Sequence, residues 1–237
     1  MVETLSTRGT DTRAQVQVNS FIQSVYNWMA IGLALTGGVA FYVASSPSLM
    51  QLIFGNQILF FGLIIGELGL VFYLSARVQK IQASTATALF IFYAALNGAT
   101  LSIIFKAYTG TSIASTFFVC AGTFVACSIY GMVTKRDLTS MGGFMRMGLI
   151  GIIIASVINL FIRSSAMMMV ISYIGVLVFV GLTAYDTQKL KHMALTQPSG
   201  MDAGVVRKGA IIGALTLYLD FINLFLMLLH ILGGSKN

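Results

Sequence analysis

The sequence predicts an all-α integral membrane protein of seven transmembrane helices, with the last helix central in the bundle. Of the 237 residues, 57% are hydrophobic and only 9% are charged, whereas soluble domains carry about 25% charged residues. Seven apolar runs are each long enough to cross a bilayer, which takes about 20 residues. The last run carries an acid, Asp220, near its middle. Acids within the membrane usually face protein or water, so this helix is expected in the interior.

The polar segment Met1–Asn19 is expected to form an arm without regular structure. No break in composition follows it, so residues 20–237 are expected to form a single transmembrane domain. The predicted spans are the seven apolar runs in chain order: Val25–Ala44, Gln57–Ala76, Ala86–Phe105, Ser112–Val133, Phe144–Ile162, Ala166–Tyr185 and Gly209–Leu232.

Most connections between these spans are short. The exception is Asp186–Lys208, which is polar and is expected to form a surface excursion. Small residues four apart lie on one face of a helix and allow close helix packing in membranes. Two such pairs, Gly62/Gly66 and Gly209/Gly213, are therefore expected at helix contacts.

The distribution of Lys and Arg predicts the orientation, because positively charged loops stay in the cytoplasm. With seven spans, eleven of these residues fall on the side of the N-terminus and three on the other side. The eleven are Arg8, Arg13, Arg77, Lys80, Lys135, Arg136, Arg146, Lys189, Lys191, Arg207 and Lys208. The N-terminus is therefore expected in the cytoplasm and the C-terminus outside.

Candidate functional residues are the few ionisable groups within the spans. Of seven acids, only Glu67, Asp186 and Asp220 fall within a span or at its end. Charged groups are costly in a bilayer, so such residues usually serve a function. Asn223, one turn after Asp220, adds a polar side chain to the last span.

Asp186 and Asp220 lie toward the same end of neighbouring spans, so modest tilt would let them meet. Two carboxyl groups that meet in a low dielectric share one proton and titrate as a unit. In ionised form they can hold a hard cation such as calcium. The alternative is structural: Asp186 caps a helix end beside Lys189, and Glu67 partners an arginine at a helix end.

Three strings carry a resemblance to a known family. They are Gly66–Gly69 (GELG), Ala184–Gln188 (AYDTQ) and Leu217–Phe225 (LYLDFINLF). Together they resemble the signature strings of the Bax inhibitor-1 family, also called the transmembrane Bax-inhibitor-motif proteins. The likeness extends from about Phe21 to Leu232.

The resemblance implies a pH-sensitive calcium leak gated by two aspartates, which match Asp186 and Asp220. The family's basic partner from the second helix maps to Arg77, and Glu67 and Asn223 would line the path. Calcium would be the transported or bound ion, held by the two aspartates, with no other cofactor. The short tail without a charged extension favours a bacterial inner-membrane member, with the lipid bilayer and other membrane proteins as partners.

Two alternatives differ in class. One is a non-transporting regulator that binds other membrane proteins or a membrane protease. The other is an intramembrane aspartyl protease, because Tyr185-Asp186 resembles half of that signature, although no Gly-x-Gly-Asp string precedes Asp220. The net charge of +7 does not indicate nucleic-acid binding, because the positive residues fall between apolar runs rather than in a cluster.

Overall fold

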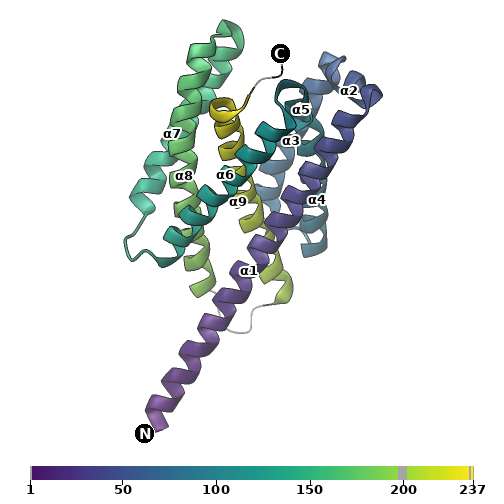
Figure 1. The fold of residues 1–237 in the computed structure, drawn as a ribbon. Coiled ribbons are helices and arrows are strands. Elements are labelled where there is room, and N and C mark those ends of the chain that lie inside the picture. Colours follow the sequence, from purple (N-terminus) through teal and green to yellow (C-terminus); the bar gives the residue numbers. More distant parts are fainter. Residues whose placement is uncertain (1, 197–201, 235, 237) are drawn as a thin grey trace. The chain divides into compact units, whose positions relative to one another are not determined.

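In the computed structural model, which describes residues 2–196, 202–234 and 236, the chain is helical and contains no extended strand in that described part. The helices follow one another along the chain (Figure 1). They are α1 (Val2–Ser45), α2 (Pro47–Phe54), α3 (Gln57–Arg77), α4 (Ala83–Leu101), α5 (Ile104–Ala107), α6 (Gly110–Val133), α7 (Thr139–Ile162), α8 (Ser165–Leu195) and α9 (Ala203–Leu232).

Seven of the described segments are long and apolar enough to cross a membrane, which confirms the predicted number of spans. Each predicted span falls within one of these segments. The last helix is the most buried: 61% of its most apolar stretch is buried, against 44% in α8 and 11–28% in the others. Such burial is expected of the innermost helix.

The chain forms two compact units. The first comprises residues 1–102 and 189–215, and the second comprises residues 103–188 and 216–237. Helices α8 and α9 therefore contribute residues to both. The prediction of a single domain stays a prediction.

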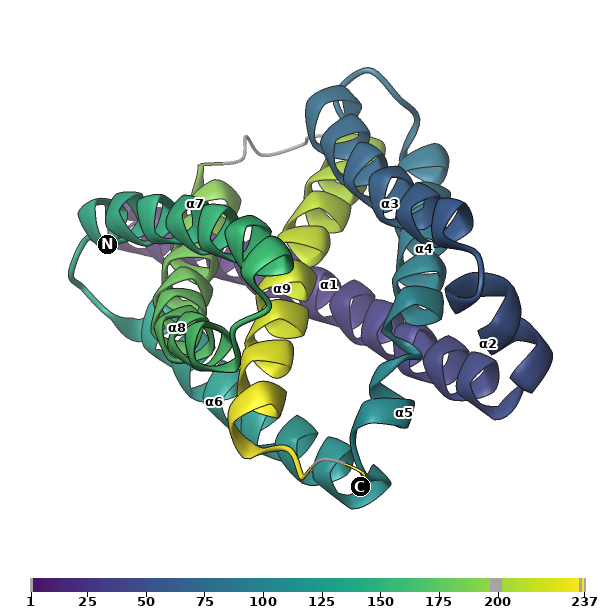
Figure 2. The ribbon, with the colours of Figure 1, turned by 90° about the horizontal axis from the view of Figure 1, so that it is seen from above.

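In the first unit, α4 contacts both α1 and α3 (Figure 2). Gly98 allows α4 to approach α1, because a Cβ atom there would lie 2.6 Å from the main-chain oxygen of Thr36. The Thr36 hydroxyl in turn donates to the main-chain oxygen of Ala94 at 2.8 Å. Within a membrane, such close contacts replace the hydrophobic effect as the force that holds helices together.

In the second unit, glycines mediate the contacts between α7 and α8. A Cβ atom on Gly148 would lie 2.9 Å from Val178, and one on Gly181 would lie 2.8 Å from Met145. The pair Gly62/Gly66, predicted at a helix contact, has nothing within 4 Å of either Cβ position, so that prediction was wrong.

Two other predictions were wrong about where the helices begin and end. Residues 2–19, predicted to lack regular structure, belong to α1, because extending an existing helix needs no new nucleus. The predicted excursion Asp186–Lys208 is mostly helical, since α8 runs to Leu195 and α9 begins at Ala203. The predicted span Ala86–Phe105 falls within the segment Ala83–Ala107, in which a turn at residues 102–103 separates α4 from α5.

The short helix α2 was not predicted. Ser46 caps its N-terminus by accepting a hydrogen bond from the Leu49 amide, and Pro47 occupies the first turn. Both features are typical of helix starts. Met50 and Ile53 anchor α2 in a small apolar cluster with Val43 of α1.

Candidate functional site

Two aspartates from different helices meet in the second unit. Asp186 on α8 and Asp220 on α9 are 7% and 5% exposed, and they are near enough for their carboxyl groups to interact electrostatically. Oδ2 of Asp220 is buried and has no hydrogen-bond partner among the described atoms. The structure therefore brings together the two acids that the sequence singled out.

Asp186 does not cap a helix end. Helix α8 continues for nine residues beyond it, to Leu195. The structural alternative for this residue was therefore wrong, because a capping side chain must lie within a residue or so of the terminus.

The turn of α8 that carries Asp186 packs tightly on α6. A Cβ atom on Gly131 would overlap the main-chain oxygen of Ala184 and would lie 3.1 Å from Cβ of Thr187. The Thr187 hydroxyl is fully buried and lies 3.5 Å from the Ser128 hydroxyl, to which it donates. The backbone contact at Gly131 and the hydroxyl pair at Ser128, both on α6, together fix the rotation of α8 at Asp186.

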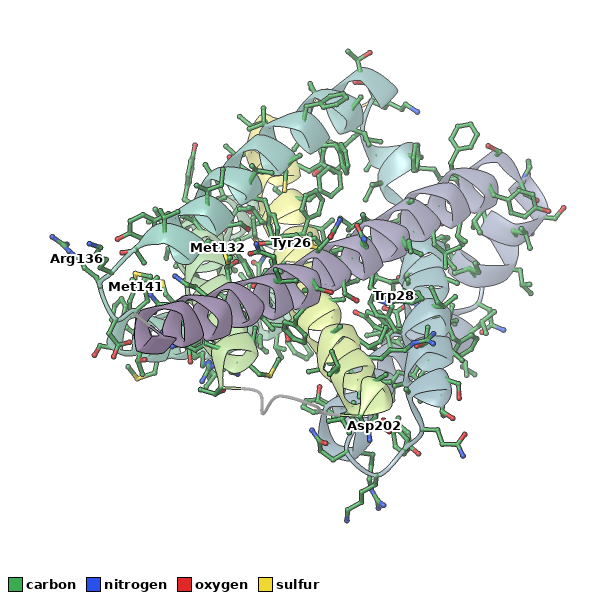
Figure 3. All side chains as sticks on the ribbon, turned by 90° about the horizontal axis from the view of Figure 1, so that it is seen from below. Tyr26, Trp28, Met132, Arg136, Met141 and Asp202 are labelled. Carbon is green, nitrogen blue, oxygen red and sulfur yellow. The ribbon has the colours of Figure 1, made fainter. Side chains whose placement is uncertain are left out.

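Gln188 ties the same turn of α8 to the connection between α6 and α7. Its side-chain oxygen accepts a hydrogen bond from the Leu138 amide at 2.9 Å, and its side-chain nitrogen donates to the main-chain oxygen of Arg136 at 2.8 Å. The Arg136 side chain itself extends away from the ribbon (Figure 3). The buried side-chain amide of Gln188 thus forms hydrogen bonds with two main-chain groups of this connection, which lie outside a helix and so lack helical hydrogen-bond partners.

Tyr185, next to Asp186, is held by α7. The Arg146 guanidinium lies 4.9 Å from the centre of the Tyr185 ring and donates to its hydroxyl at 3.2 Å. Gly142 leaves room for the ring, since a Cβ atom there would overlap it. Tyr185 therefore faces α7, whereas Asp186, one residue later on the helix, is directed elsewhere.

On α9, Phe221 anchors the chain beside Asp220. Its main-chain oxygen lies 3.7 Å from the Cys120 thiol. Its ring packs edge-on against Phe117 and Phe124, with ring centres 5.5 and 5.4 Å apart. Helix α6 therefore contacts α8 next to one aspartate and α9 next to the other.

Asn223, predicted to line a path, is half-buried. Its side-chain nitrogen donates to the main-chain oxygen of Leu219 in the same helix at 2.8 Å. Its side-chain oxygen is a further hydrogen-bond acceptor. Its role as lining stays a prediction.

The remaining predicted residues, Glu67 and Arg77, belong to the first unit. Glu67 is 8% exposed. It accepts hydrogen bonds from Asn97 Nδ2 at 3.2 Å and from Thr100 Oγ1 at 3.0 Å. These neutral partners replace the arginine considered from the sequence. Arg77 ends α3, and its role as basic partner of the aspartates stays a prediction.

Comparison with known proteins identifies the family. Residues 18–237 match the family described as "Inhibitor of apoptosis-promoting Bax1". The inner membrane protein YbhL of Escherichia coli is 54% identical over 219 residues, which cover 92% of this chain and 93% of YbhL. The chain belongs to the Bax inhibitor-1 family.

Other relatives of this Bax inhibitor-1 family member come from distant bacteria. An uncharacterized protein of Borreliella burgdorferi is 45% identical, with 92% of this chain and 94% of the relative covered. An uncharacterized membrane protein of Streptococcus pyogenes is 39% identical, with 94% and 96% covered. Together with the seven apolar helices, these relatives make the chain a multi-pass membrane protein.

Sequence reasoning missed the partners that surround the acids of this family member. Asn97 and Thr100 stand three residues apart in a span that is otherwise mostly apolar, and residues at that spacing share a helix face. The same signal, a hydroxyl within a predicted span, marks Ser128, whereas Thr187 and Gln188 follow the predicted end of their span at Tyr185. Polar residues within the predicted spans therefore point to Asn97, Thr100 and Ser128 but not to Thr187 and Gln188.

The described residues contain no group of three or more His, Cys, Asp and Glu side chains placed to hold a metal ion. The aspartate pair supplies at most four oxygens, whereas calcium takes six to eight oxygen ligands. Any calcium at the pair therefore keeps part of its water or takes oxygens from elsewhere.

Proposed function

We propose that this protein is a pH-sensitive calcium leak of the bacterial inner membrane, gated by Asp186 and Asp220. One observation supports this above all: two buried carboxyl groups from different spans interact, and one of their oxygens has no partner. Acids in this position are rare and costly in a membrane. Neither aspartate lies at a helix end, so neither serves as a helix cap.

The pair responds to pH because its two carboxyl groups cannot both ionise cheaply. With one proton between them, the acid form of one side chain donates to the carboxylate of the other. Loss of that proton places two negative charges side by side in a low dielectric, and repulsion then opposes the contact between α8 and α9. Protonation therefore controls how firmly the two helices hold together.

Gating follows if the helices have two packings of similar free energy. A difference of a few kcal/mol between two states is enough for one proton to shift their populations. Helix α6 contacts both helices beside the pair, through Gly131 and Ser128 on α8 and through Cys120 on α9. These close contacts favour a few discrete packings of α8 and α9 over a continuous range.

Calcium is the cargo in this proposal rather than a resident ion. A site with few protein oxygens binds a partly hydrated ion weakly, which suits passage better than storage. Asn223 and Glu67 would offer further polar oxygens along the path, and Arg77 would be the basic partner that stabilises the ionised pair.

We propose an N-terminus in the cytoplasm and a C-terminus outside. An odd number of spans puts the termini on opposite sides, and the eleven-to-three distribution of Lys and Arg sets the direction. With this orientation Asp186 lies toward the cytoplasmic end of α8, and Asp220 lies near the middle of α9. We propose transport rather than catalysis as the activity of this site.

Calcium flux into proteoliposomes, measured against pH, tests the proposal. We expect a pH-dependent leak in the wild type and a flattened pH response in Asp186→Asn and in Asp220→Asn. The double variant should resemble either single variant, because residues that act as one unit are non-additive. Asp202→Asn is the matched control, since this exposed residue accepts a hydrogen bond from the Gly204 amide that asparagine can also accept.

Two results would contradict the proposal in different ways. An unchanged pH response in both single variants would remove the pair from the gate. Absence of any flux above protein-free vesicles, in protein shown to be folded, would favour the non-transporting regulator. Cleavage of a test peptide by the wild type but not by Asp220→Asn would favour the protease instead.

A further inference from the structure

Glu67 lies at the centre of its span. It stands ten residues after Gln57 and ten before Arg77, the two ends of α3. At 1.5 Å per residue it is about 15 Å from either end, which is the midplane of a hydrocarbon layer about 30 Å thick. Its carboxyl group is therefore at the depth where a charge costs most.

The groups that face Glu67 are neutral. Its carboxyl oxygens contact the Asn97 amide and the Thr100 hydroxyl, both on α4. The ionisable group nearest on α4 is the buried phenol of Tyr93, which is close enough to interact with Glu67. Helix α2, which also contacts α3, has no ionisable residue in Pro47–Phe54. No described lysine, arginine or histidine pairs with Glu67, and Arg77 is ten residues away along α3.

The hydrogens of this cluster can be counted. Thr100 Oγ1 lies 3.0 Å from Glu67 Oε1 and also 3.0 Å from the main-chain oxygen of Asn97. A hydroxyl group has one hydrogen to donate and lone pairs to accept with. If Glu67 is ionised, that single hydrogen is divided between two acceptors. If Glu67 carries a proton, it donates to Thr100, which donates to Asn97, and each contact has its own hydrogen.

We propose that Glu67, Thr100 and Asn97 form a proton-binding site at the membrane midplane, separate from the aspartate pair. In the resting state Glu67 is a carboxylic acid: Oε1–H donates to Thr100 Oγ1, and Asn97 Nδ2 donates to Oε2. A buried acid without a cation takes up a proton rather than bear the cost of an unpaired charge. Release of the proton leaves a carboxylate that still accepts from the Asn97 amide, while the single Thr100 hydrogen is divided between Glu67 and the main-chain oxygen of Asn97.

The site gives the first unit its own response to protons. If the proposed leak exists, its pH profile then has two components, one from the aspartates and one from Glu67. The proton site itself does not depend on calcium transport, so it can be tested without a flux assay.

A lipid-soluble carbodiimide tests the site, because this reagent adds to protonated carboxyl groups within the membrane. The full-length protein in liposomes is treated with dicyclohexylcarbodiimide over a range of pH, and the modified residue is located by mass spectrometry. We expect an adduct on Glu67 that decreases as the pH rises, and little adduct with a water-soluble carbodiimide. Asn97→Ala, which removes a donor to the carboxylate, should keep its labelling to higher pH than the wild type.

Infrared spectroscopy gives a second readout that does not depend on reagent access. In the difference spectrum against the wild type, Glu67→Gln should remove one component of the carbonyl band of protonated carboxyl groups at neutral pH, while Asp202→Asn should leave that band unchanged. Loss of an ionised carboxylate band in Glu67→Gln instead would overturn the proposal, as would labelling of Glu67 that does not vary with pH. Neither result would bear on the aspartate pair.

Discussion

Gly131 on α6 meets Ala184 on α8 so closely that a Cβ atom on the glycine would overlap the main-chain oxygen of the alanine. The contact lies two residues before Asp186. Backbone atoms cannot move aside as a side chain can, so the distance between α6 and α8 at the aspartate pair depends on the absence of one methyl group.

Gly131→Ala should therefore destabilise the protein and disturb the pair. Overpacking of this kind typically costs about 1–3 kcal/mol, so the midpoint of thermal unfolding in detergent should fall. Gly122→Ala on the same helix is the control, because its Cβ position has nothing within 4 Å. There alanine replaces a poor helix former, so the midpoint should rise or stay constant. Equal effects of the two variants would contradict the importance of the contact.

Arg163 is strained at the end of α7. Its φ of 54° places it in the left-handed region, and among the described residues it is the one position outside glycine with positive φ. The turn is held by Asn159, whose side-chain oxygen accepts a hydrogen bond from the Ser164 amide at 3.0 Å. A side chain with a Cβ atom costs roughly 1–2 kcal/mol in this conformation.

Arg163→Gly should relieve this strain and raise the unfolding midpoint, and Arg163→Val should lower it. Glycine also makes the unfolded chain more flexible, so the net gain should be about 0.5–1 kcal/mol. Denaturation of both variants in one detergent measures the difference. A valine variant as stable as the glycine variant would show that the left-handed conformation carries no cost here.

The number of spans could be predicted from the sequence because bilayer thickness sets the length of each apolar run. The residues at which the helices begin and end could not be predicted in this way. Hydropathy identifies only the apolar part of a helix that lies within the bilayer. The polar ends of α8 and α9, which carry Lys191 and Arg207, therefore resemble a loop in the sequence. For the same reason, the polar first part of α1 was predicted to lack regular structure. Helix α2 was missed because its eight residues are too few to span, although Ser46-Pro47 is a recognisable helix start.

The aspartate pair could be predicted because acids are few in these spans, and the cost of burying them leaves few arrangements. The helix contacts could not be predicted in the same way. With 24 glycines in the chain, spacing alone cannot distinguish Gly131, which meets a neighbouring backbone, from Gly66, which has nothing within 4 Å. That difference depends on which face of each helix is turned inward.

Tyr185 offers a test of how far α7 supports α8 beside Asp186. Tyr185→Phe keeps the ring under the Arg146 guanidinium and removes only the 3.2 Å hydrogen bond, so it should cost about 0.5–1.5 kcal/mol at most. Tyr185→Leu also loses the ring contacts with Arg146 and Gly142 and should cost more. The half-exposed Tyr73→Phe on α3 serves as control in thermal unfolding. Equal stability of Tyr185→Leu and wild type would show that α7 does not position this turn.

The orientation of the chain can be measured with single cysteines. The native Cys120 and Cys127 lie within the α6 span and are first replaced by alanine. Lys135→Cys and Lys236→Cys then place thiols at exposed positions on opposite sides of the predicted membrane. Because positively charged loops stay in the cytoplasm, a membrane-impermeant maleimide should label position 236 in intact cells. It should label position 135 only after permeabilisation. The reverse pattern would invert the proposed orientation, and labelling of both positions in intact cells would contradict the three spans expected between residues 135 and 236.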